Sequence, residues 1–195
     1  MKPIDVQGFE DKFAGDPDPW QTWNGRDEVL KRKAILHALP PGKTGRMLEL
    51  GAGNGSNSRA LAQRSLRLEA TDATREGTRL IAQALAPSAP RAKAYQLIVP
   101  ARPRSAAYDT IVVAELLYYL SPRDMGLLAR QVAGRLGHGG TLVLAHHRIS
   151  FYDFVQHADG IHDRFLAATQ VAWHSRTVRR TGNWIVQSCS RALRT

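Results

Sequence analysis

The stretch ELGAGNG has the residue types and spacing of a ligand-binding loop, because Gly51, Gly53 and Gly55 alternate shortly after Glu49. Glycines at alternate positions suit neither a strand nor a helix, so we expect a loop whose bare backbone approaches a ligand. The loop follows an apolar segment and precedes a helix-compatible one, which is the usual setting of a nucleotide-binding loop. A purely structural turn is the alternative interpretation.

Three features near this loop restrict its ligand. No Gly-Lys-Ser/Thr follows, which excludes a phosphate loop of the Walker type. Ser56 occupies the place where the dinucleotide fingerprint has glycine or alanine, and Glu49 adds a carboxylate that disfavours a pyrophosphate. Asp72 ends the next apolar segment about 20 residues onward, where a carboxylate can accept both hydroxyl groups of a ribose. A helix cap is the alternative role of Asp72. Together the features indicate a cationic, phosphate-free nucleoside, and S-adenosylmethionine is such a molecule.

A second group of chemically capable side chains follows two further apolar segments, 108–114 and 141–145. The group consists of Glu115, Tyr118, Tyr119, His146 and His147. Glu115 can orient an amine or accept its proton, and tyrosine rings can stabilise a sulfonium by cation–π attraction. Adjacent strand residues point to opposite faces, so at most one of the two histidines is expected to face a site. A surface cap and ordinary packing aromatics are the alternative interpretations.

Other residues are weaker candidates. Trp20 and Trp23 lie in a segment rich in proline and aspartate, which suggests a lid that excludes water. His157 and His162 fall in a segment expected to line the substrate side. We predict no metal site, since the one grouping of Asp and His on that segment is weak and Cys189 is the only cysteine.

The elements that must position these residues alternate between strand and helix. We expect an irregular cap before residue 27, helices at 27–39, 56–65, 75–87, 121–135 and 155–168, strands at 46–50, 66–74, 91–99, 108–114 and 141–147, a turn at 137–140, and a closing hairpin at 171–191. This order predicts an α/β, Rossmann-like seven-stranded sheet, mostly parallel with a C-terminal antiparallel hairpin, and helices on both faces. We expect one domain over 1–195, with 1–40 as cap and helix and 41–195 as core. Ligands of such sheets bind beyond the carboxyl ends of the strands.

The composition is that of a basic globular protein. The chain has 27 Lys and Arg against 17 Asp and Glu, a net charge of +10 in 195 residues. The cations are dispersed and the densest groups are Arg102/Arg104 and Arg176/Arg179/Arg180, so we do not favour a nucleic-acid partner, which requires clustered cations. No apolar run approaches the about 20 residues that span a membrane, and the N-terminus is polar. We therefore expect a cytoplasmic protein, either monomeric or dimeric.

Two sets of motifs resemble known families. The segment ELGAGNG together with Asp72 resembles motifs I and II of the class I S-adenosylmethionine-dependent methyltransferases. Phe13 with Asp18-Pro19-Trp20, and the stretch YDTIVVAELLYYL at 108–120, are similar to the nodulation-factor N-methyltransferase (NodS) family. Members of that family methylate the free amine of a deacetylated chitooligosaccharide.

The resemblance implies S-adenosylmethionine as cofactor, with Glu49 at the methionine amino end, the glycines along the methionine and ribose, Asp72 on the ribose and Ala73 beside the adenine. The implied cofactor site comprises Trp20, Glu49, Gly51, Ala52, Gly53, Gly55, Asp72, Ala73, Gln96, Leu97 and Ala114. One departure concerns the third strand, which in the family ends in an acid that binds the adenine amino group. Leu97 or Ile98 stands there, so backbone groups or Gln96 must replace it.

We therefore expect transfer of a methyl group to a small acceptor, preferably the amine of an amino sugar or oligosaccharide. A neutral amine attacks unaided, whereas a hydroxyl needs a base such as His146 or His147. O-methylation of a small natural product, methylation of RNA, and a cofactor-binding module without catalysis are the alternatives. The pH dependence of the rate, removal of these histidines and salt-dependent retention on RNA would distinguish them.

Overall fold

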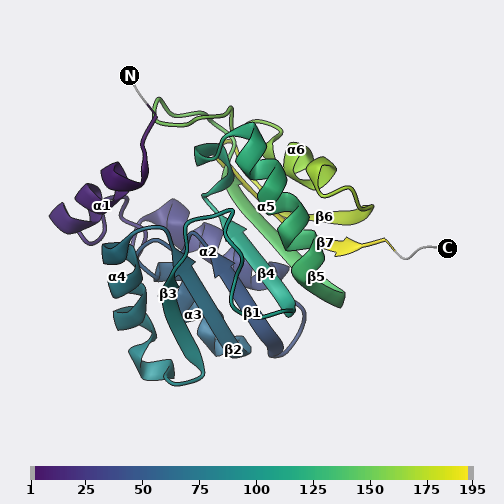
Figure 1. Ribbon diagram of the computed structural model, residues 1–195, viewed down its shortest axis with the longest axis horizontal. Helices are drawn as coiled ribbons and strands as arrows, with labels where there is room; N and C mark the ends of the chain where they lie inside the picture. The colour runs from purple at the N-terminus through teal and green to yellow at the C-terminus, as the bar shows by residue number, and fades with distance from the viewer. Residues whose placement is uncertain (1–2, 193–195) are drawn as a thin grey trace.

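The computed structural model describes residues 3–192 and shows a seven-stranded sheet covered by helices on both faces (Figure 1). The strand order is β3-β2-β1-β4-β5-β7-β6. The strands are β1 Thr44–Leu50, β2 Ser65–Asp72, β3 Ala92–Gln96, β4 Tyr108–Ala114, β5 Leu136–His147, β6 Trp173–Arg180 and β7 Trp184–Arg191. Neighbours among β1 to β5 pair in parallel, whereas β7 is antiparallel to both β5 and β6. The predicted sheet with its closing hairpin is confirmed.

Within residues 3–192, six α-helices and two short 3₁₀ helices precede or connect these strands. They are α1 Val6–Gly15, α2 Arg26–Ala38, α3 Ser56–Gln63, α4 Arg75–Leu85, η1 Ala86–Ser88, η2 Leu117–Tyr119, α5 Pro122–Arg135 and α6 Ile161–Ala168. Local sequence explains two of the starts. The Thr74 hydroxyl accepts a hydrogen bond from the amide of Gly77 at α4, and Ser121 does the same for Asp124 at α5, where Pro122 fills the first position.

Alternate residues of the buried strands pack on opposite faces of the sheet. Met47 and Val143 belong to the core shared with α2, α3 and α4, whereas their chain neighbours Leu48 and Leu142 belong to the core shared with α5 and α6. In Figure 1, α5 and α6 lie in front of the sheet and α2 and α3 lie behind it. A strand buried on both faces has no polar side to reveal its orientation, which explains the continuous apolar runs in the sequence.

The order in which the strands are added to the sheet reverses at β1, which pairs with β2 on one side and β4 on the other. In open α/β sheets, such a switch point leaves a crevice beyond the carboxyl ends of the strands. The glycine loop leaves β1 at this point, and Asp72 and Ala114 end the two adjacent strands. The fold therefore brings the predicted donor and acceptor residues to one edge.

Three local expectations are wrong. Residues 6–15 form α1 rather than an irregular cap, because the Asp5 carboxylate caps the helix by accepting from the amide of Gly8. The helix predicted at 155–168 begins only at Ile161, after Gly160 with a left-handed φ of 68°. The predicted turn at 137–140 continues as part of β5. None of the helices described in residues 3–192 has both the length and the apolar character needed to cross a bilayer.

Candidate active site

The glycine loop uses its glycines for two different purposes. Gly53 has a φ of 59°, and its amide donates to Asp72 Oδ2 at 3.0 Å. Gly55 has a φ of 82°, and a Cβ there would lie 2.8 Å from Ala84 Cβ and 3.0 Å from Ile81 Cα. Gly53 therefore ties the loop to β2, while Gly55 allows the loop to pack closely on α4.

Asp72 keeps an unused acceptor position towards the crevice. Its Oδ1 accepts from the amide of Thr74 at 2.9 Å and from the Thr74 hydroxyl at 2.7 Å, and its Oδ2 accepts from Gly53. A carboxylate offers about four acceptor positions, so one remains. Burial raises the pKa of Asp72, and the side chain is 8% exposed. The structure thus presents a rigidly held carboxylate with one position free for a ligand hydroxyl.

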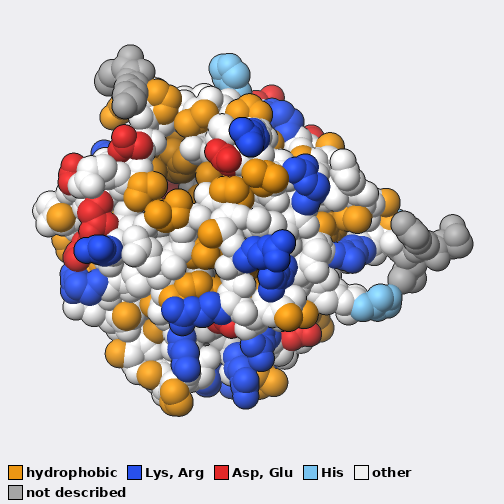
Figure 2. Space-filling view, viewed as in Figure 1, with side chains coloured by type: hydrophobic (Ala, Val, Ile, Leu, Met, Phe, Trp, Pro, Cys, Tyr) orange, Lys and Arg blue, Asp and Glu red, His pale blue; other side chains and the backbone are white. Residues whose placement is uncertain are grey.

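A cavity of about 510 Å³ opens at this edge, within the size range of small-molecule sites. Figure 2 shows hydrophobic side chains around a hollow in the upper part of the molecule, where α1 and the connection after β5 lie in Figure 1. The predicted site residues that line the cavity are Trp20, Gly51, Ala52, Gly53, Asp72, Ala73, Leu97, Ala114, Glu115, Tyr118, Tyr119 and His147.

Four members of the predicted cofactor and catalytic sets do not line this cavity: Glu49, Gly55, Gln96 and His146. Glu49 lies fully buried beneath the glycine loop, where the Ser58 hydroxyl donates to its Oε2 at 2.5 Å. Among residues 3–192, its Oε1 has no hydrogen-bond partner. Burial raises the pKa of Glu49 to about 8. Glu49 is therefore a buried acid next to the loop and does not form part of the cavity wall.

The end of the cavity next to β3 is apolar. Gln96 is exposed, and its Nε2 donates to the carbonyl of Ala73 at 2.8 Å. Leu97 and Val99 line the cavity instead, whereas Ile98 is 55% exposed. After the third strand, where the sequence has no acid, the apolar side chains of Leu97 and Val99 therefore line the cavity. Gln96 does not face the cavity and instead holds the backbone at Ala73.

An ion pair between a buried lysine and two glutamates lies in the other half of the cavity. Lys31 of α2 is 2% exposed, and its Nζ lies 2.8 Å from Glu28 Oε1 and 2.5 Å from Glu115 Oε1. Burial alone would lower the pKa of Lys31, but the carboxylates of Glu115 and Glu28 outweigh it and hold that pKa above its usual value. The Tyr118 hydroxyl donates to the other oxygen of Glu115. Glu115 is thus fixed in direction by two neighbours.

Aromatic rings form the wall beyond Glu115. Tyr118 stacks on Phe154 with ring centroids 3.7 Å apart, and Tyr119 contacts Phe9 edge-on at 4.9 Å. Phe151 packs on Phe154 at 5.4 Å. Burial raises the pKa of Tyr119, so its phenol stays neutral and can donate a hydrogen bond. This wall combines apolar area, π-faces and a donor.

The two adjacent histidines of β5 point to opposite faces, as the alternation of a strand predicts. His147 lines the cavity with its Nε2 3.7 Å from Glu115 Oε2, and its buried Nδ1 has no partner. His146 is fully buried on the α6 side. The two histidines expected on the substrate side do not line the cavity, because His157 is exposed in the connection before α6 and His162 is buried against His146.

The segment between α1 and α2 is tied to the glycine loop. Asn54 Nδ2 donates to Asp18 Oδ1 at 2.8 Å, and the Thr22 hydroxyl donates to Asn54 Oδ1 at 2.9 Å. Trp20, held between these anchors, lines the cavity and is 39% exposed, whereas Trp23 does not line it. The placement of Trp20 matches the predicted lid.

Helix α1 lies over the cavity and is attached on two sides. The carboxylate of Glu10 accepts from the amides of Arg75 and Glu76, where it caps the N-terminus of α4. On the other side, the amide of Ile4 donates to the carbonyl of Asp153 at 3.2 Å. Phe9, Lys12 and Phe13 of α1 line the cavity between these attachments.

The cavity is acidic although the chain is strongly basic. Its charged lining residues are the acids Glu28, Asp72, Glu115 and Asp153 and the cations Lys12 and Lys31. Four carboxylates against two ammonium groups leave an excess of negative charge, within a chain of net charge +10. Such a lining attracts a cationic ligand.

Several of the residues that line the cavity were not predicted from the sequence. Lys31 had a recognisable signal, because it falls on the same face of α2 as Ala34, Ile35 and Ala38, all of which are buried. A lysine on an apolar stripe requires a buried partner. Phe151 and Phe154 gave no periodic signal, since they lie in an irregular connection.

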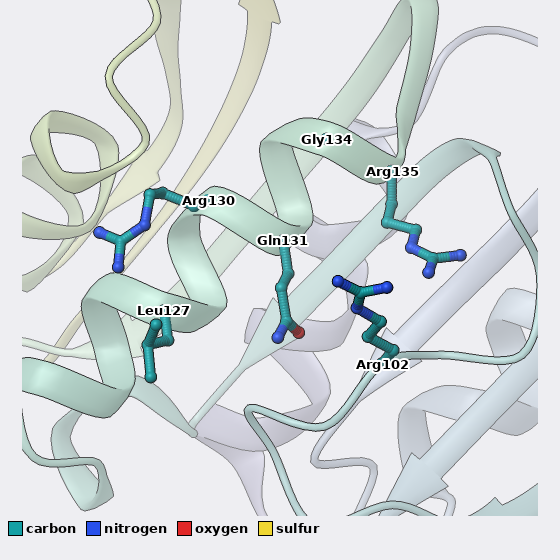
Figure 3. Close-up of a pocket in the computed structure, with 6 residues that line it drawn as sticks. All are labelled: Arg102, Leu127, Arg130, Gln131, Gly134 and Arg135. Carbon is teal, nitrogen blue, oxygen red and sulfur yellow. The ribbon is translucent and has the colours of Figure 1, made fainter.

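A second hollow of about 400 Å³ lies against α5, away from the cavity (Figure 3). It is lined by Arg102, Leu127, Arg130, Gln131, Gly134 and Arg135. Arg102 and Arg135 extend towards each other from its two sides, and Arg130 turns outward. Within residues 3–192, none of the three arginines has a carboxylate within 4 Å.

Known structures share this architecture. The N-methyltransferase NodS from Bradyrhizobium japonicum WM9, solved with S-adenosyl-L-homocysteine, has a TM-score of 0.82 and 20% identity, covering 95% of this chain and 97% of that chain. A putative methyltransferase from Pseudomonas syringae has a TM-score of 0.72 and 26% identity, covering 85% and 99%. The mitomycin 7-O-methyltransferase MmcR has a TM-score of 0.69 and 14% identity, covering 94% of this chain and 60% of its own.

The strand order, the glycine loop at the switch point and the acid at the end of β2 define a class I methyltransferase fold. The chain belongs to the methyltransferase domain family, which matches residues 23–187. No curated protein sequence matches the chain significantly. The predicted class of S-adenosylmethionine-dependent methyltransferase, with its structural similarity to NodS, is confirmed.

Proposed function

We propose that the protein transfers a methyl group from S-adenosylmethionine to the amine of a small molecule, preferably an amino sugar or an oligosaccharide that carries one. The observation that carries this proposal is the acid-rich, aromatic cavity within a basic chain. Its negative charge suits both a sulfonium donor and the ammonium group that forms when the acceptor amine is methylated. The sequence resemblance to the NodS family supports the amino sugar.

The donor half of the cavity fits the cofactor. S-adenosylmethionine supplies an electrophilic methyl group on a sulfonium when bound. The free acceptor position of Asp72 is suited to the ribose, and the backbone of Gly51 and Gly53 can approach the methionine portion. Leu97 and Val99 offer an apolar surface for the adenine. The solved complex of NodS with S-adenosyl-L-homocysteine supports this assignment.

The acceptor half has the groups that an amine requires. Glu115, fixed by Lys31 and Tyr118, can orient an N–H of the acceptor. The rings of Tyr118 and Tyr119 exclude water and favour positive charge as the new C–N bond forms. The amine must be neutral before it attacks, and it then needs no base from the protein.

O-methylation is the second candidate, and one observation favours it. His147 lines the same cavity with its Nε2 3.7 Å from Glu115 Oε2, and an imidazole placed there can remove a proton from a hydroxyl. MmcR is by its name an O-methyltransferase and shares the fold.

A paired acceptor assay tests the proposal. Chitosan oligosaccharides and a simple phenol are offered with labelled donor from pH 6 to 9, with His147→Gln and, as matched control, the exposed His138→Gln. We expect methylated amine, with a rate that rises through the acceptor's own pKa and falls less than about tenfold in His147→Gln. Loss of about 100-fold or more with the phenol as the better acceptor would establish O-methylation instead.

A further inference from the structure

Two buried histidines outside the cavity form a hydrogen-bonded chain beneath its acceptor wall. His146 is the second-last residue of β5 and is 0% exposed, and His162 lies in the first turn of α6 and is 4% exposed. The Nδ1 of His146 lies 3.0 Å from the Nε2 of His162, and the Nδ1 of His162 lies 2.7 Å from Gln187 Oε1 on β7.

The position of each proton follows from the first contact in this chain. The amides of Leu116 and Leu117 both point at His146 Nε2, each at 3.2 Å. Amides only donate, so this nitrogen must be unprotonated and His146 must carry its proton on Nδ1. That proton is donated to His162 Nε2, which places the proton of His162 on Nδ1 and directs it to Gln187 Oε1. The opposite direction would set a ring N–H against two amide N–H groups.

The hydrogen-bonded chain of histidines supports the turn whose residues form part of the acceptor wall. Leu116 and Leu117 lie between Glu115, whose φ is 52°, and the short helix η2. The backbone direction here decides where Glu115 and Tyr118 point, and the Tyr118 ring also contacts the ring of His146 edge-on at 5.5 Å. A left-handed residue followed by two amides without a backbone partner needs such support from its surroundings.

We infer that His146, His162 and Gln187 are positioning residues: a chain of two neutral imidazoles, both protonated on Nδ1, that fixes the turn after β4 and so shapes the acceptor side of the active site. Burial lowers the pKa of His146, and the neighbouring His162 and Lys31 act in the same sense. Burial also lowers the pKa of His162 to about 4. Both rings therefore stay neutral at neutral pH, and neither acts as a base on the acceptor.

The tautomers are measured directly by long-range ¹H–¹⁵N NMR of the imidazole rings in the ligand-free protein at pH 6 to 8. We expect two of the seven histidines to be Nδ1–H tautomers whose shifts do not change over this range. Variants His146→Asn and His162→Asn assign the signals, and the exposed His138 and His157 serve as ordinary references. An Nε2–H tautomer at either buried ring, or titration of either ring near pH 6.5, would overturn the inference.

A pair of variants at Gln187 tests whether the acceptor at the end of the chain matters for the reaction. Gln187→Glu keeps an acceptor for the His162 proton, whereas Gln187→Leu leaves the buried Nδ1–H of His162 without one. We expect Gln187→Leu to keep the Nδ1–H tautomer of His146, which the amides of Leu116 and Leu117 fix, and to lower acceptor kcat/KM by about 10-fold to 100-fold, because the unpaired N–H displaces the chain by a small distance. At pH 8, Gln187→Glu should keep both the tautomers and the activity. S-adenosylhomocysteine binding, measured by calorimetry, should change less than twofold in either variant.

Equal losses of acceptor kcat/KM in the two variants would show that Gln187 matters only for packing, and an unchanged Gln187→Leu would show that the chain does not position the wall. The measurement of acceptor kcat/KM rests on the proposed function. The NMR measurement of the tautomers needs no substrate, so failure of the proposed acceptor and failure of this inference remain distinguishable.

Discussion

Two hollows of the molecule, the cavity at the carboxyl ends of the strands and the hollow on α5, have opposite chemistry. The cavity at the carboxyl ends of the strands has four carboxylates against two lysines, whereas the hollow on α5 has three arginines and no acid among its lining residues. The net charge of +10 therefore describes the outer surface and not the active site. A chain's overall charge is thus a poor guide to the charge of its ligand, which depends on the few groups that face the site.

The hollows also differ in how firmly their charges are held. Asp72 accepts three hydrogen bonds, and Glu115 is bonded to Lys31 and Tyr118. In the part of the chain that the structure describes, the side chains of Arg102 and Arg130 make no hydrogen bond, and Figure 3 shows them extended from their backbones. Fixed charges are a property of preorganised sites, and this contrast supports the cavity as the place of chemistry.

The largest expected effect concerns Glu49, the acid buried beneath the cavity. Its pKa is about 8 in the folded protein against 4.5 for an ordinary glutamate. Between these values the folded state keeps a proton that the unfolded chain has lost, so the free energy of unfolding falls as the pH rises. The total fall is about 5 kcal/mol at 1.36 kcal/mol per pKa unit. Urea denaturation from pH 5 to 8 measures it.

Glu49→Gln, which mimics the protonated form, should flatten this dependence, while Glu76→Gln, at a partly exposed acid whose pKa is lowered rather than raised by its hydrogen bond to Arg79, should leave the fall in place. A Glu49→Gln protein whose stability follows the same pH curve as the original would show that Glu49 is ionised throughout. Glu49 would then be charged in the folded protein, as the acids on the surface are.

The next largest effect concerns Asp72. Asp72→Ala should weaken the binding of S-adenosylhomocysteine by about 1–3 kcal/mol, because the ligand hydroxyl and the amide of Gly53 lose their acceptor. Calorimetry measures the dissociation constant, and Asp72→Asn, which retains one acceptor oxygen, should lose less. An unchanged affinity in Asp72→Ala would remove Asp72 from the donor site.

The smallest effect is expected at the arginine hollow. The double variant Arg102→Gln/Arg130→Gln removes two charges from this hollow, whose lining residues all differ from those of the cavity. Exposed charges are screened over about 8 Å at physiological salt, so the dissociation constant for S-adenosylhomocysteine should stay within twofold. A tenfold change in calorimetry would show that the two hollows are coupled and would end the separation drawn between them.

The residues of the proposed donor half could be picked out from the sequence because their signals are local. Asp72 ends β2 and Gly53 lies in the loop after β1, and both strands are marked by apolar runs. The alternation of a strand also predicted that His146 and His147 would separate. It could not say which one faces the cavity, because β5 is buried on both faces and its sequence has no polar side.

The acceptor half was only partly predictable because it is assembled from distant segments. Phe9 of α1, Lys31 of α2 and Phe154 after β5 meet around Glu115 only once the sheet has formed. Helix α1 escaped prediction because its stability depends on the Asp5 cap and on packing against the cavity. Such contacts depend on tertiary structure, and no periodicity in the sequence records them.

The two attachments of α1 have a consequence for the speed of the enzyme. Helix α1 and the connection after β5 both line the cavity and are joined by the hydrogen bond between Ile4 and Asp153. Separation of these two segments would break that hydrogen bond, and in many enzymes such an opening step is slower than the bond-making step. A contact that never touches the methyl group can thus bear on the turnover rate.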